Sequence, residues 1–288
     1  MKKEKIQVSY IITFLVLITY TIILIFFFSW GFFTSLKTKN YFNNIDKVFP
    51  TAPWEWEWSN YAKALDGFNY SAYGIPTTLG EQILWSFLYA GGASLMSLIC
   101  TCTVSYVVAK YKYRFCELIY AFVVISMALP LVGNVPAMII FLNKLELFDT
   151  IPGMLIMSYT FLDMYFLIFH GAFSGISEEY RDAARIDGAS EWTIFFKIML
   201  PLVSPIMYTV FLINFIERWN NFQFAHLYMP THPTLAYSVS YAMKRNPKLD
   251  TVPLKLASSM ILALPMIVLF IVFRNKIMGN MTLGGVKE

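Results

Sequence analysis

Ionisable side chains gather in one stretch of this chain, SEEYRDAARIDGASEWTIFFKIMLPLVSP (residues 177–205). Five of them fall within eight residues: Glu178, Glu179, Arg181, Asp182 and Arg185. Charges spaced in this way on a short helix suit ion pairs and hydrogen bonds with a groove on another protein. An amphipathic connector lying on a membrane surface would carry the same residue types, so these residues alone leave both interpretations open.

Isolated polar residues inside long apolar runs form a second candidate site. Burying such groups at membrane depth is costly, so they indicate either a solute pathway or pairing between helices. The candidates are Tyr159, Asp163, Glu217, Trp219, Asn220 and Asn221. Pairing of Glu217 with the adjacent Arg218 or with Asp163 would explain the charged members without any solute.

The sequence gives no support for bond-breaking chemistry. It lacks the G-x-x-x-x-G-K-[ST] loop that cradles nucleotide phosphates, and its three histidines (His170, His226 and His232) are far apart. Cys100 and Cys102 lie inside an apolar run, where packing is their expected role. We therefore expect no enzymatic activity, no metal and no cofactor on this chain.

The composition predicts a protein that uses the lipid bilayer as its solvent. Hydrophobic residues make up 57% of the 288 and charged residues only 14%, whereas soluble domains carry about 25% charged residues. A chain with so few charges cannot cover a globule with solvated side chains. The net charge of +4 includes no lysine or arginine run dense enough for nucleic acid.

Six apolar segments are long enough to cross a membrane, which takes about 20 helical residues. We place them at Ile11–Phe33, Ile83–Ala109, Leu118–Leu142, Met154–Phe173, Leu202–Phe222 and Leu254–Phe273. We divide the chain into residues 1–82, with the first span and the first external loop, and residues 83–288, with the other five spans. The second part includes the charged loop, which we define as residues 174–201.

Basic residues near the span ends predict that both termini are cytoplasmic, because lysine and arginine favour the inner side of the membrane. The residues on the inner side would be Lys2, Lys3, Lys5, Lys110, Lys112, Arg114, Arg181, Arg185, Lys197, Arg274 and Lys276. Fewer basic residues, such as Lys37, Lys39 and Lys255, lie close to the opposite ends. This orientation makes the charged loop cytoplasmic and leaves external loops at about residues 34–82 and 223–253.

The charged loop reads locally as two short helices. Ser177 is a plausible N-cap, and Gly188 suits the left-handed position that ends a helix. Ser190 then caps a second helix of bulky apolar residues, and Pro201 marks its end before the fifth span begins.

The run AARIDGAS followed by LPLVSP resembles the cytoplasmic loop of ATP-binding-cassette (ABC) importer permeases. The pattern of that family is Glu-Ala-Ala, three residues, Gly, and about nine residues later an apolar residue followed by Leu-Pro. Here Asp182, Ala183 and Ala184 stand at the first positions and Gly188 at the glycine. Seven further stretches, in order along nearly the whole chain, resemble the carbohydrate-uptake branch of the family. They are FTSLKTKN, SNYAKAL, VVAKYKYRF, MALP, LELFDTIPGM, ERWNNF and LGGVKE.

The resemblance implies an all-α integral membrane protein with the type I ABC importer permease fold, in a prokaryotic plasma (inner) membrane. It implies a second homologous permease, two ATPase subunits that hold ATP and magnesium, and an extracytoplasmic solute-binding protein that delivers a sugar. By analogy, a coupling helix would contact the ATPase through Glu179, Asp182, Ala183, Ala184, Asp187, Gly188 and Ala189. The six polar and aromatic candidates in the spans would then line the pathway, since aromatic faces with amides and carboxylates suit sugars.

Three other classes stay open at this point. An ion-coupled secondary transporter would show internal repeats and ionisable residues in several spans, and this chain shows neither clearly. An ABC permease for a solute other than a sugar fits the same loop. For an integral scaffold or receptor, the likeness in the charged loop would be a coincidence.

Overall fold

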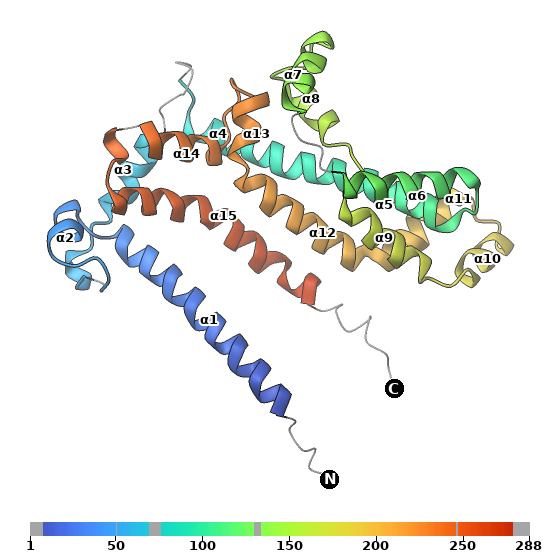
Figure 1. Cartoon of the computed structure of the whole chain (residues 1–288), viewed down its shortest axis with the longest axis horizontal. Coiled ribbons are helices and arrows are strands. Elements are labelled where there is room, and N and C mark those ends of the chain that lie inside the picture. Colours follow the sequence, from blue (N-terminus) through green and yellow to red (C-terminus); the bar gives the residue numbers. More distant parts are fainter. Residues whose placement is uncertain (1–7, 50, 69–75, 130–133, 246, 279–288) are drawn as a thin grey trace. The chain divides into compact units, whose positions relative to one another are not determined.

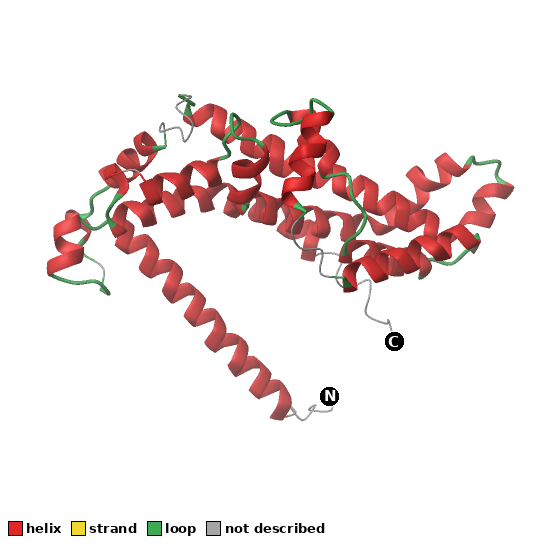
Figure 2. Cartoon of the chain, turned by 45° about the horizontal axis from the view of Figure 1, so that its top comes forward, coloured by secondary structure: helices red, strands yellow, loops and turns green. Residues whose placement is uncertain are grey.

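A computed structural model of the chain describes residues 8–49, 51–68, 76–129, 134–245 and 247–278. Helices joined by short loops make up these residues, which contain no strand (Figure 2). The predicted all-α class is therefore confirmed. Three sequence features fall wholly or partly outside the described residues: the N-terminal lysines, Pro130 of MALP and the C-terminal LGGVKE.

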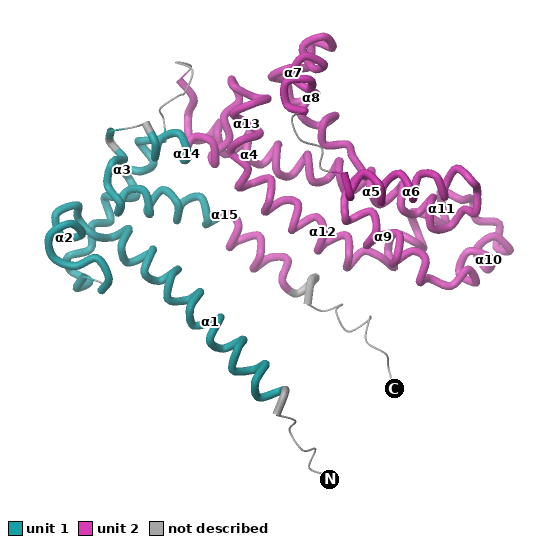
Figure 3. Tube along the Cα trace, viewed as in Figure 1, with its two compact units in different colours: residues 1–71, 239–264 teal, residues 72–238, 265–288 magenta. Residues whose placement is uncertain are grey.

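The chain divides into two compact units, drawn in two colours in Figure 3. Unit 1 comprises residues 1–71 and 239–264, and unit 2 comprises residues 72–238 and 265–288. The structure thus groups part of the last span with the N-terminal region. The division of the sequence at residue 82 stays a prediction.

Unit 1 is built around the end of the first helix. Its elements are α1 (Val8–Ser35), α2 (Lys39–Asn44), η1 (Pro53–Glu55), α3 (Ser59–Gly67), the larger part of α14 (Leu235–Arg245), η4 (Pro247–Leu249) and the first part of α15 (Val252–Met278). The buried Asn60 amide donates hydrogen bonds to the carbonyls of Ser35 (2.9 Å) and Lys37 (2.8 Å). Because carbonyls at a helix C-terminus lack partners within the helix, these bonds join α3 to the end of α1.

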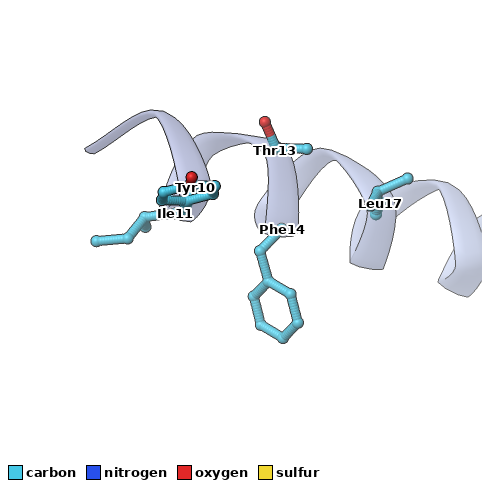
Figure 4. Close-up of a pocket in the computed structure, with 5 residues that line it drawn as sticks. All are labelled: Tyr10, Ile11, Thr13, Phe14 and Leu17. Atoms are coloured by element: carbon cyan, nitrogen blue, oxygen red, sulfur yellow. The ribbon is translucent and has the colours of Figure 1, made fainter. Parts of the chain in front are cut away.

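The outer surface of α1 is apolar and open. A hollow on it is lined by Tyr10, Ile11, Thr13, Phe14 and Leu17. All five come from this one helix, and Figure 4 shows Thr13 and Phe14 pointing to opposite sides of it. Because only one helix lines this hollow, it does not enclose a ligand. We interpret it as part of the apolar, bilayer-facing surface of α1 and assign it no ligand.

Unit 2 holds most of the predicted spans. Its elements are α4 (Leu79–Phe87), the π-helical η2 (Leu88–Gly92), α5 (Ala93–Lys110), α6 (Arg114–Ala128), α7 (Val135–Lys144), α8 (Ile151–Met157), α9 (Met164–Ser174), α10 (Glu179–Ile186), α11 (Glu191–Ile194), the π-helical η3 (Phe195–Met199), α12 (Leu200–Asn220), α13 (Phe222–Tyr228), the start of α14 (Leu235–Arg245) and the end of α15. The helices α5, α9 and α12 pack against one another. Buried residues such as Phe169, Phe173 and Met199 form their common core.

Four of the predicted spans lie in helices that are long and apolar enough to cross a membrane. Among the described residues, these are Tyr10–Ser35, Leu79–Lys110, Glu191–Asn220 and Val252–Arg274. The other two predicted spans are each built from two shorter helices, α6 with α7 and α8 with α9. Mean hydropathy reveals apolar length but not the local hydrogen bonds that end a helix, so the sequence suggested continuous segments.

Pro201 does not end a helix, contrary to the prediction. The chain is helical from Glu191 to Asn220, and Pro201 lies in the first turn of α12 directly after the π-helical η3. A proline inside an α-helix removes one hydrogen bond and clashes with the carbonyl four residues earlier. The wider π-helical turn changes the backbone at that point, so the charged loop continues into the fifth span without a break.

The corner before α8 leaves no room for a side chain at Gly153, and this gives a stability test. A Cβ atom built there lies 2.0 Å from the Leu147 carbonyl oxygen. We expect Gly153→Ala to destabilise the protein by about 2 kcal/mol and to lower its Tm in detergent by roughly 4–8 °C. Gly171→Ala is the matched control, because no atom lies within 4 Å of its Cβ position. Equal Tm values for the two variants would contradict this description of the corner.

Candidate functional site

The charged loop lies at the opposite end of unit 2 from α4 and α13 (Figure 1). Its first helix, α10, ends at Ile186 and is followed by the cap residue Asp187 and by Gly188, which has a φ of +78°. The Ala189 N–H donates to the Ala184 carbonyl (2.9 Å) and the Gly188 N–H to the Arg185 carbonyl (3.0 Å). These bonds complete a left-handed helix end of the kind that glycine favours, as the sequence predicted.

One of the two predicted serine caps is found in the loop. The Ser190 Oγ accepts a hydrogen bond from the Thr193 N–H (3.2 Å) and caps α11, as predicted. The prediction for Ser177 is wrong, because Glu178 occupies the N-cap position of α10 and no side chain caps that helix. The Ser177 Oγ accepts from the Glu179 N–H (3.3 Å), one residue too early in the chain to be the cap.

The outer face of α10 is polar and hollowed. Five of the seven predicted coupling residues are exposed on the chain: Glu179, Asp182, Ala183, Asp187 and Gly188. Ala184 is buried and Ala189 half-buried, so these two support the helix from within. The hollow is lined by Glu179, Tyr180, Ala183, Asp187 and Ile198, among others. Small and acidic residues thus face outwards around a shallow depression that another protein could fill.

Two buried cations hold the beginning of α10 to the end of α5. The Lys110 ammonium donates to the Ile176 carbonyl (2.7 Å) and to Glu178 Oε1 (2.9 Å). The Arg181 guanidinium donates to Glu178 Oε2 (3.0 Å) and to the Lys110 carbonyl (2.9 Å). The side chains of Lys110 and Arg181 are 1% and 5% exposed, whereas that of Glu178 is 56% exposed. We call these three residues the clamp.

The charge of Glu178 is stabilised by these neighbours. Partial burial alone would raise the pKa of its carboxyl, but the hydrogen bond from Lys110 and the charges of Lys110 and Arg181 outweigh that effect and lower the pKa. A carboxyl with a lowered pKa keeps its stabilising interaction above its ordinary pKa and loses it only as the pH falls through the lowered value. The Glu178 carboxylate of the clamp therefore stays charged at neutral pH.

A second, more exposed network continues from the clamp to α11. The Arg181 guanidinium lies 5.0 Å from the ring centre of Tyr111, whose hydroxyl donates to Glu191 Oε2 (2.7 Å). Arg185 reaches Glu191 Oε1 with two nitrogens, at 2.7 and 2.9 Å. Both helices of the charged loop are thus tied to each other and to the residues that follow α5.

The second candidate site lies at the break between α8 and α9, within the fourth predicted span. Asp163 ends the non-helical stretch, and its Oδ1 accepts a hydrogen bond from the Phe166 N–H (3.1 Å) as the N-cap of α9. The Thr101 hydroxyl of α5 donates to the Thr160 carbonyl (3.0 Å), and the Ser105 hydroxyl to the Phe166 carbonyl (3.1 Å). Asp163 and Thr101 therefore satisfy backbone groups that a continuous helix would have paired within itself, whereas Ser105 adds a bond to a carbonyl inside α9.

Charged and aromatic side chains surround this break. Glu217 and Arg218 of α12 both lie within electrostatic range of Asp163. Arg218 also donates to the Ser158 hydroxyl (3.3 Å), and 56% of the Tyr159 surface is exposed. The structure thus brings together Tyr159, Asp163 and Glu217, which the sequence had proposed as one site.

The other three predicted pathway residues have local structural partners. Trp219 is 1% exposed, and its ring packs against those of Phe87 (5.0 Å) and Phe215 (5.7 Å) between ring centres. The Asn221 side-chain Oδ1 accepts from the Phe224 N–H (3.0 Å) and caps α13. Asn220 is exposed, with its amide bonded to the Ile216 carbonyl (2.8 Å). Trp219 therefore supports the core in this conformation instead of offering its face to a solute.

Sequence reasoning missed the residues that organise both sites. Lys110 was used only to orient the membrane spans, and Thr101 and Ser105 were not selected as functional residues. A lysine directly at the end of an apolar helix was the available signal for the clamp. Hydroxyls spaced four residues apart on one helix face were the available signal for the support of the break.

Comparison with known proteins identifies the family. Residues 102–274 match the sequence profile of the binding-protein-dependent transport system inner membrane component. This range begins in α5 and contains the charged loop and the helix break.

Two similar relatives and one solved structure extend the comparison to most of the chain. The arabinooligosaccharides transport system permease protein AraQ of Halalkalibacterium halodurans is 28% identical over 67% of this chain and 69% of its own length. The diacetylchitobiose uptake system permease protein NgcG of Streptomyces coelicolor is 25% identical over 93% and 86%. A crystal structure of a bacterial ABC transporter that imports the polysaccharide alginate covers 95% of this chain and 98% of its own, with a TM-score of 0.71 at 18% identity. The predicted permease fold is thereby confirmed.

The capping role of Asp163 gives a direct test of the helix break. We expect Asp163→Ala to destabilise the protein by about 1 kcal/mol, because the first turn of α9 loses its acceptor. Asp163→Asn is the control, since its side-chain oxygen can still accept the bond from the Phe166 N–H. Thermal unfolding in detergent measures both, and an Asn variant as unstable as the Ala variant would show that the charge, not the cap, is what stabilises the break.

Proposed function

Since the chain belongs to the family of binding-protein-dependent transport system inner membrane components, we propose that it is a permease subunit of an ATP-driven importer for a sugar or an oligosaccharide. The relatives named above are permeases of arabinooligosaccharide and diacetylchitobiose uptake systems. A second homologous permease would complete the pathway, and an extracytoplasmic solute-binding protein would deliver the sugar. ATP and magnesium would bind to two separate ATPase subunits.

The observation that carries this proposal is the exposed face of α10. Its acidic and small residues line a hollow together with Tyr180 and Ile198. The helix is closed by the left-handed turn at Gly188, and a short charged helix of this kind fits a groove on a partner protein. With both termini in the cytoplasm, this face points towards a cytoplasmic ATPase. Glu179, Asp182, Ala183, Asp187 and Gly188 would then form the contact, supported by Ala184 and Ala189.

The helix break is the proposed place where the sugar passes. Discontinuous helices near the membrane midplane form substrate sites in many transporters, because their free ends and polar caps can bind a solute. Tyr159, Asp163 and Glu217 would offer an aromatic ring and two carboxylates there, and Asn220 of α12 would add an amide to the pathway. Trp219 and Asn221 would shape this pathway indirectly, through the packing of α12 and the cap of α13.

Reconstitution tests the proposed function directly. The chain, its companion permease, the ATPase and the solute-binding protein are placed in liposomes with ATP on the ATPase side. We expect uptake of a labelled arabinooligosaccharide or diacetylchitobiose that needs every component and stops when ATP is replaced by a non-hydrolysable analogue. Uptake by this chain alone, driven by an ion gradient, would instead identify a secondary transporter, and ATP-driven uptake of a different solute would redirect the substrate assignment.

Variants at Gly188 distinguish the effect of backbone strain from the effect of a disturbed contact with the ATPase. A Cβ atom there meets no atom within 4 Å on this chain, but the φ of +78° disfavours most side chains. Gly188→Asn tolerates this backbone better than other residues do, whereas Gly188→Trp adds bulk on the proposed ATPase face. We expect uptake to fall about tenfold or more in the Trp variant, equivalent to about 1.4 kcal/mol, and to stay close to wild type in the Asn variant.

Thermal unfolding of each Gly188 variant reports any loss of folding, so that strain is not mistaken for lost contact. Binding of the ATPase is measured on the detergent-solubilised complex. If the Trp variant binds the ATPase and transports as well as the Asn variant, Gly188 does not lie in the contact surface.

A further inference from the structure

Helix α5 contacts both candidate sites, although neither lies next to it in the sequence. Its last residue, Lys110, belongs to the clamp at the charged loop. Its middle carries Thr101 and Ser105, which hydrogen-bond the backbone at the break between α8 and α9. Nine residues separate Thr101 from Lys110, so about 14 Å of helix joins the two sites at 1.5 Å per residue.

The clamp gives α10 an attachment that the chain connectivity does not provide. Covalently, α10 is joined to α9 on one side and to α11 on the other. Lys110 lies 66 residues before Ile176 and 68 before Glu178. Its ammonium fixes both the backbone that leads into α10 and the carboxylate that precedes the helix. Arg181 of α10 adds a contact in the opposite direction, because its guanidinium donates to the Lys110 carbonyl (2.9 Å).

The burial of the clamp explains why it would hold during movement. Removing one partner of a buried ion pair leaves a charge without compensation, which is strongly unfavourable. Lys110 and Arg181 are almost completely buried and share the single carboxylate of Glu178. If α10 moved away from α5, Lys110 would lose both Glu178 and the Ile176 carbonyl, and Arg181 would lose the Lys110 carbonyl.

Hydrogen bonds from the middle of α5 attach this helix to the break between α8 and α9 in the same way. Thr101 and Ser105 are at most 1% exposed, and both donate to carbonyls of the stretch from Thr160 to Phe166. Asp163 lies inside that stretch and caps α9. A shift of α5 along its axis would therefore displace the backbone on both sides of Asp163, or would leave buried polar groups unpaired, which is also unfavourable.

We propose that α5 transmits the movement of the charged loop to the helix break, and that Lys110, Glu178, Thr101 and Ser105 are the positioning residues of this connection. The inference rests on the proposed function, because it assumes that an ATPase moves α10 and that the solute passes the break. It adds that α5, in addition to the helices covalently joined to α10, links ATP hydrolysis to transport.

The test measures the number of sugar molecules taken up per ATP hydrolysed by the complete transporter in liposomes. Lys110→Gln and Glu178→Gln are compared singly and together with the wild type. We expect each single variant to assemble with the ATPase, to hydrolyse ATP at a rate within about twofold of wild type, and to lower the transport ratio about fivefold or more. The double variant should have the same transport ratio as either single variant, because the two single variants and the double variant all lose the same ion pair.

Two controls separate transmission from general damage. Arg185→Gln breaks an exposed ion pair within the charged loop, between Arg185 and Glu191, and we expect it to leave the transport ratio unchanged. Lys110→Arg keeps a buried cation at the same place and should restore much of the ratio that Lys110→Gln loses. A purely structural role of Lys110 would lower assembly and Tm while leaving the ratio of the assembled complexes intact.

Variants in the middle of α5 keep the inference testable if the clamp variants fail to assemble. Thr101→Val and Ser105→Ala remove the hydroxyls with little change of volume and no change of charge. We expect the double variant Thr101→Val/Ser105→Ala to hydrolyse ATP without proportionate uptake. A wild-type ratio in this variant, or in assembled Lys110→Gln complexes, would overturn the inference. Absence of ATP-driven uptake in the wild type would instead refute the proposed function itself.

Discussion

Backbone hydrogen bonding at membrane depth is the constraint on which the rest of unit 2 depends. A hydrocarbon interior offers no water to an unpaired N–H or carbonyl, so a chain can leave the helical conformation there only where side chains replace the lost bonds. Asp163 does so by capping α9, and Thr101 does so by donating to the Thr160 carbonyl. Ser105 adds a bond to the Phe166 carbonyl inside α9. The polar side chains at the break are thus required by the break itself. Any role in binding a solute would come in addition to this requirement, which explains why isolated polar residues in a span indicate a site without defining its use.

The same reasoning applies to charge at the other end of α5. Lys110 ends an apolar helix and has no space to reach solvent, because its side chain is 1% exposed. Its ammonium is paired with Glu178 and the Ile176 carbonyl, and these contacts fix where the charged loop begins. Arg181 then fills the remaining place on Glu178 and covers the ring of Tyr111. The position of α10 therefore follows from the need to compensate two buried cations. The residues on its outer face take no part in that compensation.

The sequence predicts those features that depend on neighbouring residues and fails for those that depend on distant ones. Gly188 and Ser190 act over one to three residues, and their roles were readable from residue type and spacing. The fold class and family followed from apolar lengths and the pattern around Asp182. By contrast, the burial of Trp219 depends on Phe87, far away in the sequence. The role of Lys110 depends on Glu178, and the helical path through Pro201 depends on a π-helical turn that has no clear sequence signature. Hydropathy alone could not show that the fourth span is broken, because the residues of the break, including Phe161 and Leu162, are themselves largely apolar.

The two attachments of α10 restrict the kind of movement that unit 2 can make. Through Gly188 and the capped start of α11, α10 is joined to a helix that continues to Asn220 without a break. Through the clamp, it is joined to α5, and α5 and α12 pack against each other and against α9. A helix held in both ways cannot rotate or slide independently without breaking either the tight turn or the buried ion pairs. A force applied to its outer face would therefore tilt α5, α9 and α12 together, which is the rigid-body rocking expected of a protein that exposes a pathway alternately to the two sides of a membrane.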